Sequence, residues 1–209
     1  MKFLNNYLND FKLEKWQIVS VLCLVFVISG FFGWIYEFIF YYFNGGMDKF
    51  YWRGGNFLPW INIYAIGAIM ILVLAFIYRR NPFLVFLIAF FSTGLLEFFS
   101  GLVIYRVFGL RFWDYNTEIL NFLNIGGYVC LRSVSFFGVS ALLLMYVIVP
   151  ICIYLSTHIN KKVFMTLCIC LFSIVLFDEL YNLVFSRVLH LPRAHDVYYR
   201  IGFNFMNYR

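Results

Sequence analysis

The chain has 209 residues, of which 64% are hydrophobic and only 12% charged, and its formal net charge is +6. A soluble domain carries about a quarter charged residues, so this composition excludes an ordinary soluble protein and indicates one that spans a membrane, where lipid-facing positions are as apolar as the core. The basic residues stand at the ends of apolar runs and accompany no nucleic-acid motif. They are therefore interpreted as anchors at lipid headgroups, and no nucleic-acid partner is expected.

The N-terminal segment, residues 1–16, is predicted to form an amphipathic helix at the membrane surface, because Phe3, Tyr7 and Phe11 recur at helical spacing among polar residues. Five apolar stretches follow. Each has the length that crosses about 30 Å of hydrocarbon at 1.5 Å per residue. The predicted spans are Ile18–Phe43, Trp60–Tyr78, Pro82–Tyr105, Phe136–Thr157 and Val163–Ser186.

We therefore predict an all-α fold, a polytopic membrane helical bundle of about five transmembrane helices. Residues 17–186 would form the transmembrane domain and residues 187–209 an interfacial C-terminal tail. Tight turns at Arg79-Arg80 and at Asn160-Lys161 force antiparallel neighbours, which places the longer connections and the tail on one side of the membrane. A short helix is predicted at Thr117–Leu123 within the second long connection. The basic tight turns and N-terminus favour a cytoplasmic N-terminus.

Four carboxylates stand inside the predicted spans: Glu37, Glu97, Asp178 and Glu179. An ionisable group in hydrocarbon costs about 3 kcal/mol or more, so such residues are functional candidates. Spans one, three and five cross in the same direction, and three of these residues stand roughly 22–29 Å from the start of their spans at the helical rise. We therefore expect all four carboxylates in the leaflet next to the long connections.

The glycines fit this interpretation. Gly30 and Gly33 share a helical face with Glu37, as Gly94 and Gly101 do with Glu97, which would set each glutamate at a helix–helix contact. Two readings stay open for each carboxylate. It could line a functional cavity, or it could form an ion pair with Arg53, Arg111 or Arg132 that only fixes helix packing.

No motif of a known soluble enzyme class is present: there is no Walker A loop, nucleophile elbow, HExxH or Gly-rich dinucleotide turn. The cysteines and histidines show no metal-ligand spacing. We therefore expect no cofactor and no metal. The sequence leans against an enzyme. Catalysis nevertheless stays open, because membrane enzymes often use scattered carboxylates.

The motifs between Gly33 and Gly138 resemble those of the putative ABC-transporter permease family, type IV (CmpB-like), which are small bacterial membrane proteins. The elements that carry the resemblance are Gly33-Trp34-Ile35-Tyr36-Glu37, Arg53-Gly54, the stretch from Leu58-Pro59 to Gly67-Ala68, Leu96-Glu97-Phe98, Trp113-Asp114-Tyr115-Asn116, and Asn124 to Cys130-Leu131. The chain departs from the family pattern at Asn62, Asn116 and Tyr128, where the family has Pro, Ser and Arg, and it resembles a divergent member.

The resemblance implies a transport role in the bacterial cytoplasmic membrane. The leading hypothesis is a transport or substrate-binding component for a small or amphipathic ligand, with an acidic and aromatic cavity in one leaflet. The alternatives are a membrane enzyme acting on a lipid or lipid-linked substrate and a non-catalytic subunit of a larger complex. Candidate partners are membrane lipids, an ATPase or other membrane subunit, and a second copy of the chain. The predicted ligand-binding residues are Glu37, Arg53, Tyr64, Glu97, Arg111, Trp113, Asp114, Tyr115, Asn124, Arg132, Asp178 and Glu179.

Overall fold

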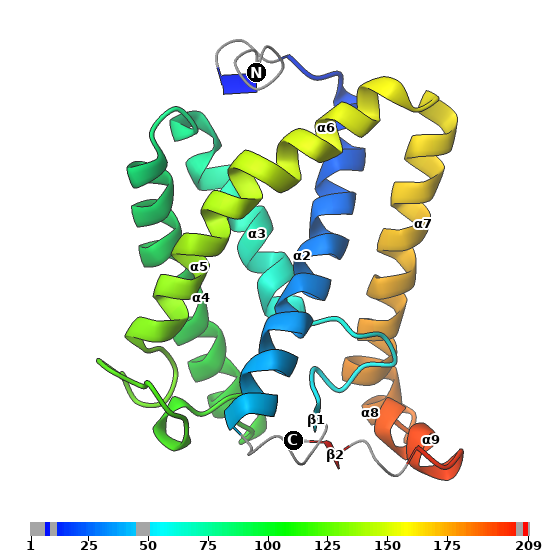
Figure 1. Cartoon of the computed structure of the whole chain (residues 1–209). Coiled ribbons are helices and arrows are strands. Elements are labelled where there is room, and N and C mark those ends of the chain that lie inside the picture. The colour runs from blue at the N-terminus through cyan, green and yellow to red at the C-terminus, as the bar shows by residue number, and fades with distance from the viewer. Residues whose placement is uncertain (1–6, 9–11, 45–50, 204–206, 209) are drawn as a thin grey trace. The chain divides into compact units, whose positions relative to one another are not determined.

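The structure is a computed structural model that describes residues 7–8, 12–44, 51–203 and 207–208. Figure 1 shows the chain coloured from N- to C-terminus. It divides into two compact units. The α4–α5 unit comprises Met1–Leu13 and Gly67–Tyr154, and the α2–α7 unit comprises Glu14–Ile66 and Leu155–Arg209. Helices α3 and α6 contribute residues to both units.

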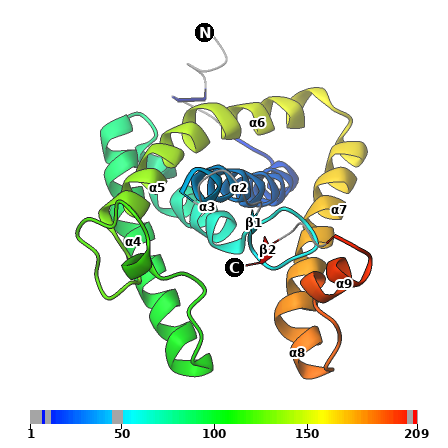
Figure 2. The ribbon, with the colours of Figure 1, turned by 60° about the horizontal axis from the view of Figure 1, so that its bottom comes forward.

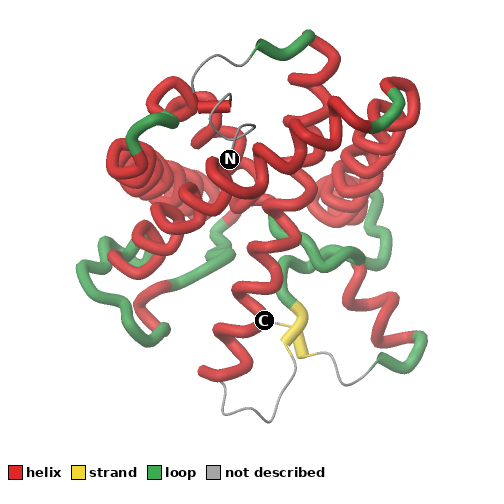
Figure 3. The backbone as a smooth tube through the Cα atoms, turned by 45° about the horizontal axis from the view of Figure 1, so that its top comes forward, coloured by secondary structure: helices red, strands yellow, loops and turns green. Residues whose placement is uncertain are grey.

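The α2–α7 unit is built on two long helices, α2 (Lys15–Asn44) and α7 (Lys161–Leu180), which pack against each other. A π-helical turn at Tyr181–Phe185 continues α7 into α8 (Ser186–Val188), and α9 (Ala194–Arg200) follows. Figure 2 shows α9 beside the C-terminal end of α7. The two-residue strands β1 (Tyr51–Trp52) and β2 (Asn207–Tyr208) pair in parallel, as Figure 3 shows in yellow.

The α4–α5 unit is built on α4 (Pro82–Phe108) and α5 (Leu131–Leu143), which pack against each other. Helix α3 (Asn62–Ala75) leads through a 3₁₀ turn at Phe76–Tyr78 into the tight turn before α4. Helix α5 leads through a π-helical turn at Leu144–Ile148 into α6 (Val149–His158). This π turn lies just before Pro150, which has no backbone N–H to donate and whose ring crowds the preceding turn.

The ends of α4 follow directly from the local sequence. Asn81 caps the N-terminus because its side chain accepts hydrogen bonds from the amides of Phe83 and Leu84, and Pro82 occupies the first helical position, where no N–H is needed. Gly109 ends the helix with a φ of 66°, the left-handed conformation that glycine adopts most readily. These signals set both the length of α4 and the position of Glu97 along it.

The structure confirms the predicted fold class. Within the described residues, four helical stretches are long and apolar enough to cross a membrane: Lys15–Phe43, Pro82–Phe108, Leu131–His158 and Lys161–Val188. The predicted second span corresponds to the shorter apolar helix Asn62–Tyr78. The chain is therefore an all-α membrane protein of about five spans.

The helix predicted at Thr117–Leu123 is wrong. The chain forms only a 3₁₀ turn at Tyr115–Thr117, and Leu120 and Leu123 have φ values of 54° and 51°. A right-handed helix cannot continue through left-handed residues. Most of the predicted N-terminal helix, residues 1–6 and 9–11, lies outside the described residues, although Tyr7 and Leu8 are helical.

The dibasic turn before α4 also holds the described part of the N-terminal segment. Arg79 Nε donates to the carbonyl oxygen of Tyr7 at 2.9 Å, and Arg80 Nε donates to that of Leu8 at 3.1 Å. The buried Tyr7 hydroxyl donates to the carbonyl oxygen of Met145 at 3.0 Å. The two arginines, which the sequence predicts to be headgroup anchors, therefore also bind another part of the chain.

Candidate functional site

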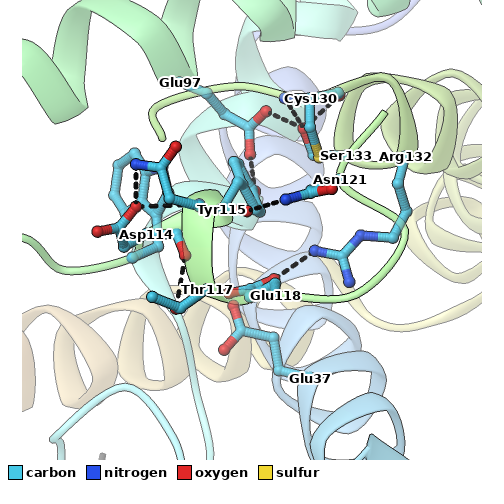
Figure 4. Close-up of polar contacts among 12 residues, drawn as sticks. Glu37, Glu97, Asp114, Tyr115, Thr117, Glu118, Asn121, Cys130, Arg132 and Ser133 are labelled. Atoms are coloured by element: carbon cyan, nitrogen blue, oxygen red, sulfur yellow. Dashed lines mark hydrogen bonds and ion pairs between the residues drawn. The ribbon is translucent and has the colours of Figure 1, made fainter. Parts of the chain in front are cut away.

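The most deeply buried of the predicted carboxylates is Glu97, which is 4% exposed on α4. The Tyr115 hydroxyl donates to Glu97 Oε1 at 2.6 Å, and the Ser133 hydroxyl donates to Glu97 Oε2 at 2.7 Å. Figure 4 shows the three side chains converging from α4, from the segment before α5, and from α5. We call Glu97, Tyr115 and Ser133 the Glu97 cluster.

Two glycines allow other residues to approach α4 closely on either side of Glu97. A Cβ at Gly94 would lie 3.0 Å from Val134 Cγ1 on α5. A Cβ at Gly101 would lie 2.9 Å from Tyr128 Cδ1 and 3.1 Å from Trp113 Cζ2. Small residues at these two positions therefore let α5 and the connecting segment pack directly onto the helix.

The α4–α5 loop, residues 109–130, holds Tyr115 in place. Tyr115 N donates to the carbonyl oxygen of Gly127 at 3.0 Å, and Asn121 Nδ2 donates to the carbonyl oxygen of Tyr115 at 3.0 Å. Burial raises the pKa of the Tyr115 phenol well above its ordinary value, and the negative charge of Glu97 raises the pKa further. Tyr115 is therefore a neutral hydrogen-bond donor at physiological pH.

Ser133 was not predicted as a site residue. It stands in the first turn of α5, where its Oγ accepts from the backbone N–H of Cys130 at 3.3 Å and lies 2.9 Å from the Cys130 carbonyl oxygen. The sequence signal is its position. Ser133 stands three residues after Cys130, the residue that precedes α5, where a polar side chain can complete a capping box. Its contact with Glu97 depends on the packing of α5 on α4, which no local pattern contains.

Four other predicted residues of this unit shape the loop itself. Arg111 Nη1 lies 3.1 Å from Asp114 Oδ1 and donates to the carbonyl oxygen of Gly126 at 3.1 Å. Trp113 Nε1 donates to the carbonyl oxygen of Tyr128 at 2.9 Å. Asn124 Oδ1 accepts from Gly127 N at 2.8 Å. These contacts fold the loop so that Tyr115 meets Glu97.

Arg132, at the start of α5, forms an ion pair with Glu118, and only 14% and 8% of the two side chains are exposed. The Arg132 guanidinium also lies over the Tyr115 ring, 5.5 Å from its centroid. Glu118 was missed by sequence reading because it stands in a connection rather than inside a predicted span. It compensates the charge of Arg132 next to the Glu97 cluster.

In the α2–α7 unit, the structure brings together Glu37, Arg53 and Tyr64. Arg53 Nε donates to Glu37 Oε2 at 2.8 Å, the Tyr64 hydroxyl donates to Oε1 at 3.2 Å, and the Arg53 guanidinium lies 3.9 Å from the Tyr41 ring centroid. A Cβ at Gly33 would overlap the Tyr64 ring, so this glycine is what allows α3 to approach α2 here. Glu37 is thus bound in an ion pair, one of the two alternatives its position left open.

Asp178 and Glu179 bind the segment that leads into α3. Asp178 Oδ1 and Oδ2 accept from the backbone amides of Phe57 at 3.0 Å and Leu58 at 2.7 Å. Glu179 accepts from the side-chain amides of Asn56 at 2.7 Å and Asn62 at 2.5 Å. Among the described residues neither carboxylate has a cationic partner within ion-pair distance.

The C-terminal tail is attached to the same segment. Asn182 Nδ2 donates to Asp178 Oδ1 at 2.8 Å, and Asn182 Oδ1 accepts from the amide of Ala194 at 2.9 Å. The Tyr198 hydroxyl donates to the carbonyl oxygen of Phe57 at 2.7 Å. The segment 56–58 is therefore held from α7 on one side and from α9 on the other.

The predicted site residues thus form two groups, one in each unit. Glu97, Arg111, Trp113, Asp114, Tyr115, Asn124 and Arg132 belong to the α4–α5 unit, and Glu37, Arg53, Tyr64, Asp178 and Glu179 belong to the α2–α7 unit. Within the described parts of the chain, no group of three or more His, Cys, Asp or Glu side chains is placed to hold a metal ion. Of the two groups, the one in the α4–α5 unit contains the most deeply buried carboxylate, Glu97, which accepts hydrogen bonds from two hydroxyl groups.

Comparison with known proteins gives one family. The sequence pattern of the family described as "Putative ABC-transporter type IV" (CmpB) matches residues 24–183, well over half of the chain. No curated protein and no solved structure matches this chain. The matched region contains both groups of site residues and runs from within α2 to just past the end of α7. The chain therefore belongs to this ABC-transporter type IV family and is a membrane protein related to transport.

Proposed function

We propose that this chain is the membrane-embedded component of a transporter and that the Glu97 cluster binds the cationic group of a small or amphipathic ligand. One observation carries the proposal: Glu97, at 4% exposure on a membrane-spanning helix, is held by two hydroxyl groups at 2.6 and 2.7 Å. The charged form of a carboxylate in such an apolar environment is strongly stabilised by a positively charged partner.

The geometry of Ser133 supports an exchange of partners. Its Oγ lies 2.7 Å from Glu97 Oε2 and 2.9 Å from the Cys130 carbonyl oxygen, so its single proton can be donated to either acceptor. When a cation or a proton neutralises Glu97, this hydroxyl has a second acceptor available. When the Ser133 hydroxyl lets go of Glu97, it therefore still has a hydrogen-bond acceptor. This lowers the free-energy cost of ligand entry.

Family membership supports the transport role and an ATPase as partner. The acidic and aromatic residues around the cluster, together with the ion pair of Arg132 and Glu118, would set ligand selectivity. In this proposal Trp113, Asp114 and Asn124 act through the loop, because they determine where Tyr115 lies.

The test is binding of a lipophilic cation, tetraphenylphosphonium, to the purified full chain in lipid nanodiscs. Glu97→Gln keeps the side chain's size and removes its charge, and it is expected to lower the affinity at least tenfold. Glu14→Gln, at an exposed position outside the cluster, is the control and should bind as the wild type does. Wild-type affinity in Glu97→Gln, with the helical circular dichroism unchanged, would overturn the assignment.

A second candidate, a non-catalytic subunit of a larger membrane complex, is favoured by three internal ion pairs: Arg53 with Glu37, Arg111 with Asp114, and Arg132 with Glu118. A scaffold needs such pairs and no free binding group. Co-purification of a stoichiometric membrane partner, together with unchanged tetraphenylphosphonium binding in Glu97→Gln, would favour this function. Lipid turnover by the reconstituted chain, lost in Glu97→Gln, would instead indicate a membrane enzyme.

We also propose that the chain lies in the bacterial cytoplasmic membrane with its N-terminus in the cytoplasm, as an interfacial segment 1–16, a transmembrane domain 17–186 and a tail 187–209. The basic N-terminus and tight turns support this orientation. Labelling of whole cells with a membrane-impermeant maleimide tests it. A cysteine introduced at His195 should react, and one introduced at Lys12 should react only after the cells are opened.

A further inference from the structure

The α4–α5 loop carries an unusual number of exposed apolar side chains for a segment outside the helices. The exposed fraction rises from 43% at Phe112 to 77% at Leu123. We call six of these exposed residues the apolar face: Phe112, Ile119, Leu120, Phe122, Leu123 and Ile125. Large apolar side chains left exposed together in one short segment mark a contact with a membrane or another protein.

The backbone of the loop is built around this face. Leu120 and Leu123 both have left-handed φ values, 54° and 51°. This conformation is unfavourable for a residue that carries a Cβ atom. The conformation is held by the hydrogen bond from Leu131 N to the carbonyl oxygen of Phe122 at 2.8 Å. In water these two leucines would be unfavourable in two ways, through their backbone conformation and through the exposure of their apolar side chains.

The loop satisfies many of its own polar groups. Tyr115 N bonds to Gly127 O, Ile125 N bonds to Val129 O at 2.9 Å, and the Asp114 side chain accepts from Asn116 N at 3.0 Å. Irregular backbone is tolerated near hydrocarbon only when its N–H and C=O groups have partners within the protein. At these three positions the loop backbone therefore meets the requirement for contact with lipid.

The helix that precedes the loop ends in exposed apolar side chains. Val103, Val107 and Phe108, on the last turns of the membrane-spanning α4, are each more than half exposed. Arg106 is exposed on the same turns, where its charge suits lipid phosphates at the end of a span. Exposed apolar side chains continue past the end of α4 at Leu110 and Phe112, with the exposed Arg111 between them.

Because the loop joins two stretches that are long and apolar enough to cross a membrane, Pro82–Phe108 and Leu131–His158, we propose that it inserts its apolar face into the headgroup–acyl interface of the bilayer. Leu120, Phe122 and Leu123 would enter the lipid, while Tyr115 of the same loop binds Glu97. The occupant of this face is lipid rather than a partner protein, because both ends of the loop are tied to membrane-spanning stretches and α4 ends in exposed apolar side chains. This assignment is independent of what the Glu97 cluster binds.

The test uses the full chain reconstituted in phosphatidylcholine vesicles whose acyl chains are brominated near the headgroup, at the 6 and 7 positions. Leu123→Trp adds one fluorophore at the most exposed apolar position. Thr117→Trp adds one at an exposed polar position of the same loop and is the matched control. The fluorescence of each added tryptophan is obtained by subtracting the wild-type signal in brominated and unbrominated vesicles.

We expect the Leu123→Trp emission to be blue-shifted and quenched at least twofold by the bromines, and more strongly than the emission of Thr117→Trp. Red-shifted, unquenched emission from Leu123→Trp would place the loop in water and overturn the proposal. Blue-shifted emission without quenching would show that a protein surface covers the face and would also overturn it. Equal quenching at the two positions would contradict an apolar face that is directed to lipid.

Discussion

The Tyr115 hydroxyl donates a hydrogen bond to Glu97 Oε1 at 2.6 Å, although the two residues are 18 positions apart in the sequence. Tyr115 comes from an irregular loop, whereas Glu97 lies deep in a membrane-spanning helix. The contact therefore joins the connection outside the span to the buried carboxylate.

Tyr115→Phe removes this hydroxyl and leaves the ring in place. Hydrogen bonds to charged groups contribute about 1.5–3 kcal/mol, so the variant should be destabilised by about 2 kcal/mol. Thermal unfolding in detergent measures the loss. Tyr105→Phe, which removes an exposed hydroxyl from the end of α4, is the control and should change stability by less than about 0.5 kcal/mol. Equal losses in the two variants would argue against the bond to Glu97.

The same bond predicts a dependence on alkaline pH. Burial, and then the charge of Glu97, raise the pKa of folded Tyr115 above its ordinary value of 10.0. Because the folded state holds the proton more tightly, this stability is fully present below pH 10.0 and is lost as the pH rises toward the folded pKa. The difference in melting temperature between wild type and Tyr115→Phe should therefore stay constant from about pH 7 to 9.5 and shrink at higher pH. A difference that stays flat to pH 11, about one unit above the ordinary value, would contradict the raised pKa.

The Arg53–Glu37 pair should behave as a buried ion pair, since 11% and 18% of the two side chains are exposed. Arg53→Gln leaves the Glu37 carboxylate without its cation, which we expect to cost about 3 kcal/mol. The double variant Glu37→Gln/Arg53→Gln should cost less than the sum of the two single variants, because each single change leaves an uncompensated charge.

Thermal unfolding of the four chains of this cycle measures the coupling. The exposed pair of His195 and Asp196 provides the comparison, with about 45% of each side chain accessible. His195→Gln should cost less than about 1 kcal/mol. Additive effects at Arg53 and Glu37 would mean that the pair contributes nothing to folding.

Asp178→Asn should loosen the segment that leads into α3. An asparagine has one acceptor oxygen, so only one of the amides of Phe57 and Leu58 keeps its bond, and the new NH₂ group faces the other. We expect a loss of about 1–3 kcal/mol and faster hydrogen exchange in residues 56–60. Mass spectrometry of the exchanged peptide checks this. Asp196→Asn, at an exposed cap of α9, should leave that peptide unchanged.

Some features of the site could be predicted from the sequence because they depend on spacing along one helix. Apolar length predicted the spans, and the helical repeat put Gly33 on the face of Glu37, where the structure places Tyr64. Family motifs selected Glu97, Trp113 and Tyr115 in order, although they did not say that Tyr115 reaches Glu97.

The partner of each charged residue was decided only by tertiary structure. Arg53, Arg111 and Arg132 were interchangeable candidates in the sequence, yet they bind Glu37, Asp114 and Glu118 respectively. Asp178 is held by backbone amides, which have no signature in side-chain sequence.

By itself the sequence determined that this chain crosses a membrane and which of its residues are too costly to bury without a reason. The cost of an ionisable group in hydrocarbon is local, so it can be read from one helix at a time. Only the tertiary structure decided how each cost is met. Loop 109–130 folds back through left-handed leucines to deliver Tyr115, and α5 delivers Ser133, because those approaches depend on packing between segments distant in sequence.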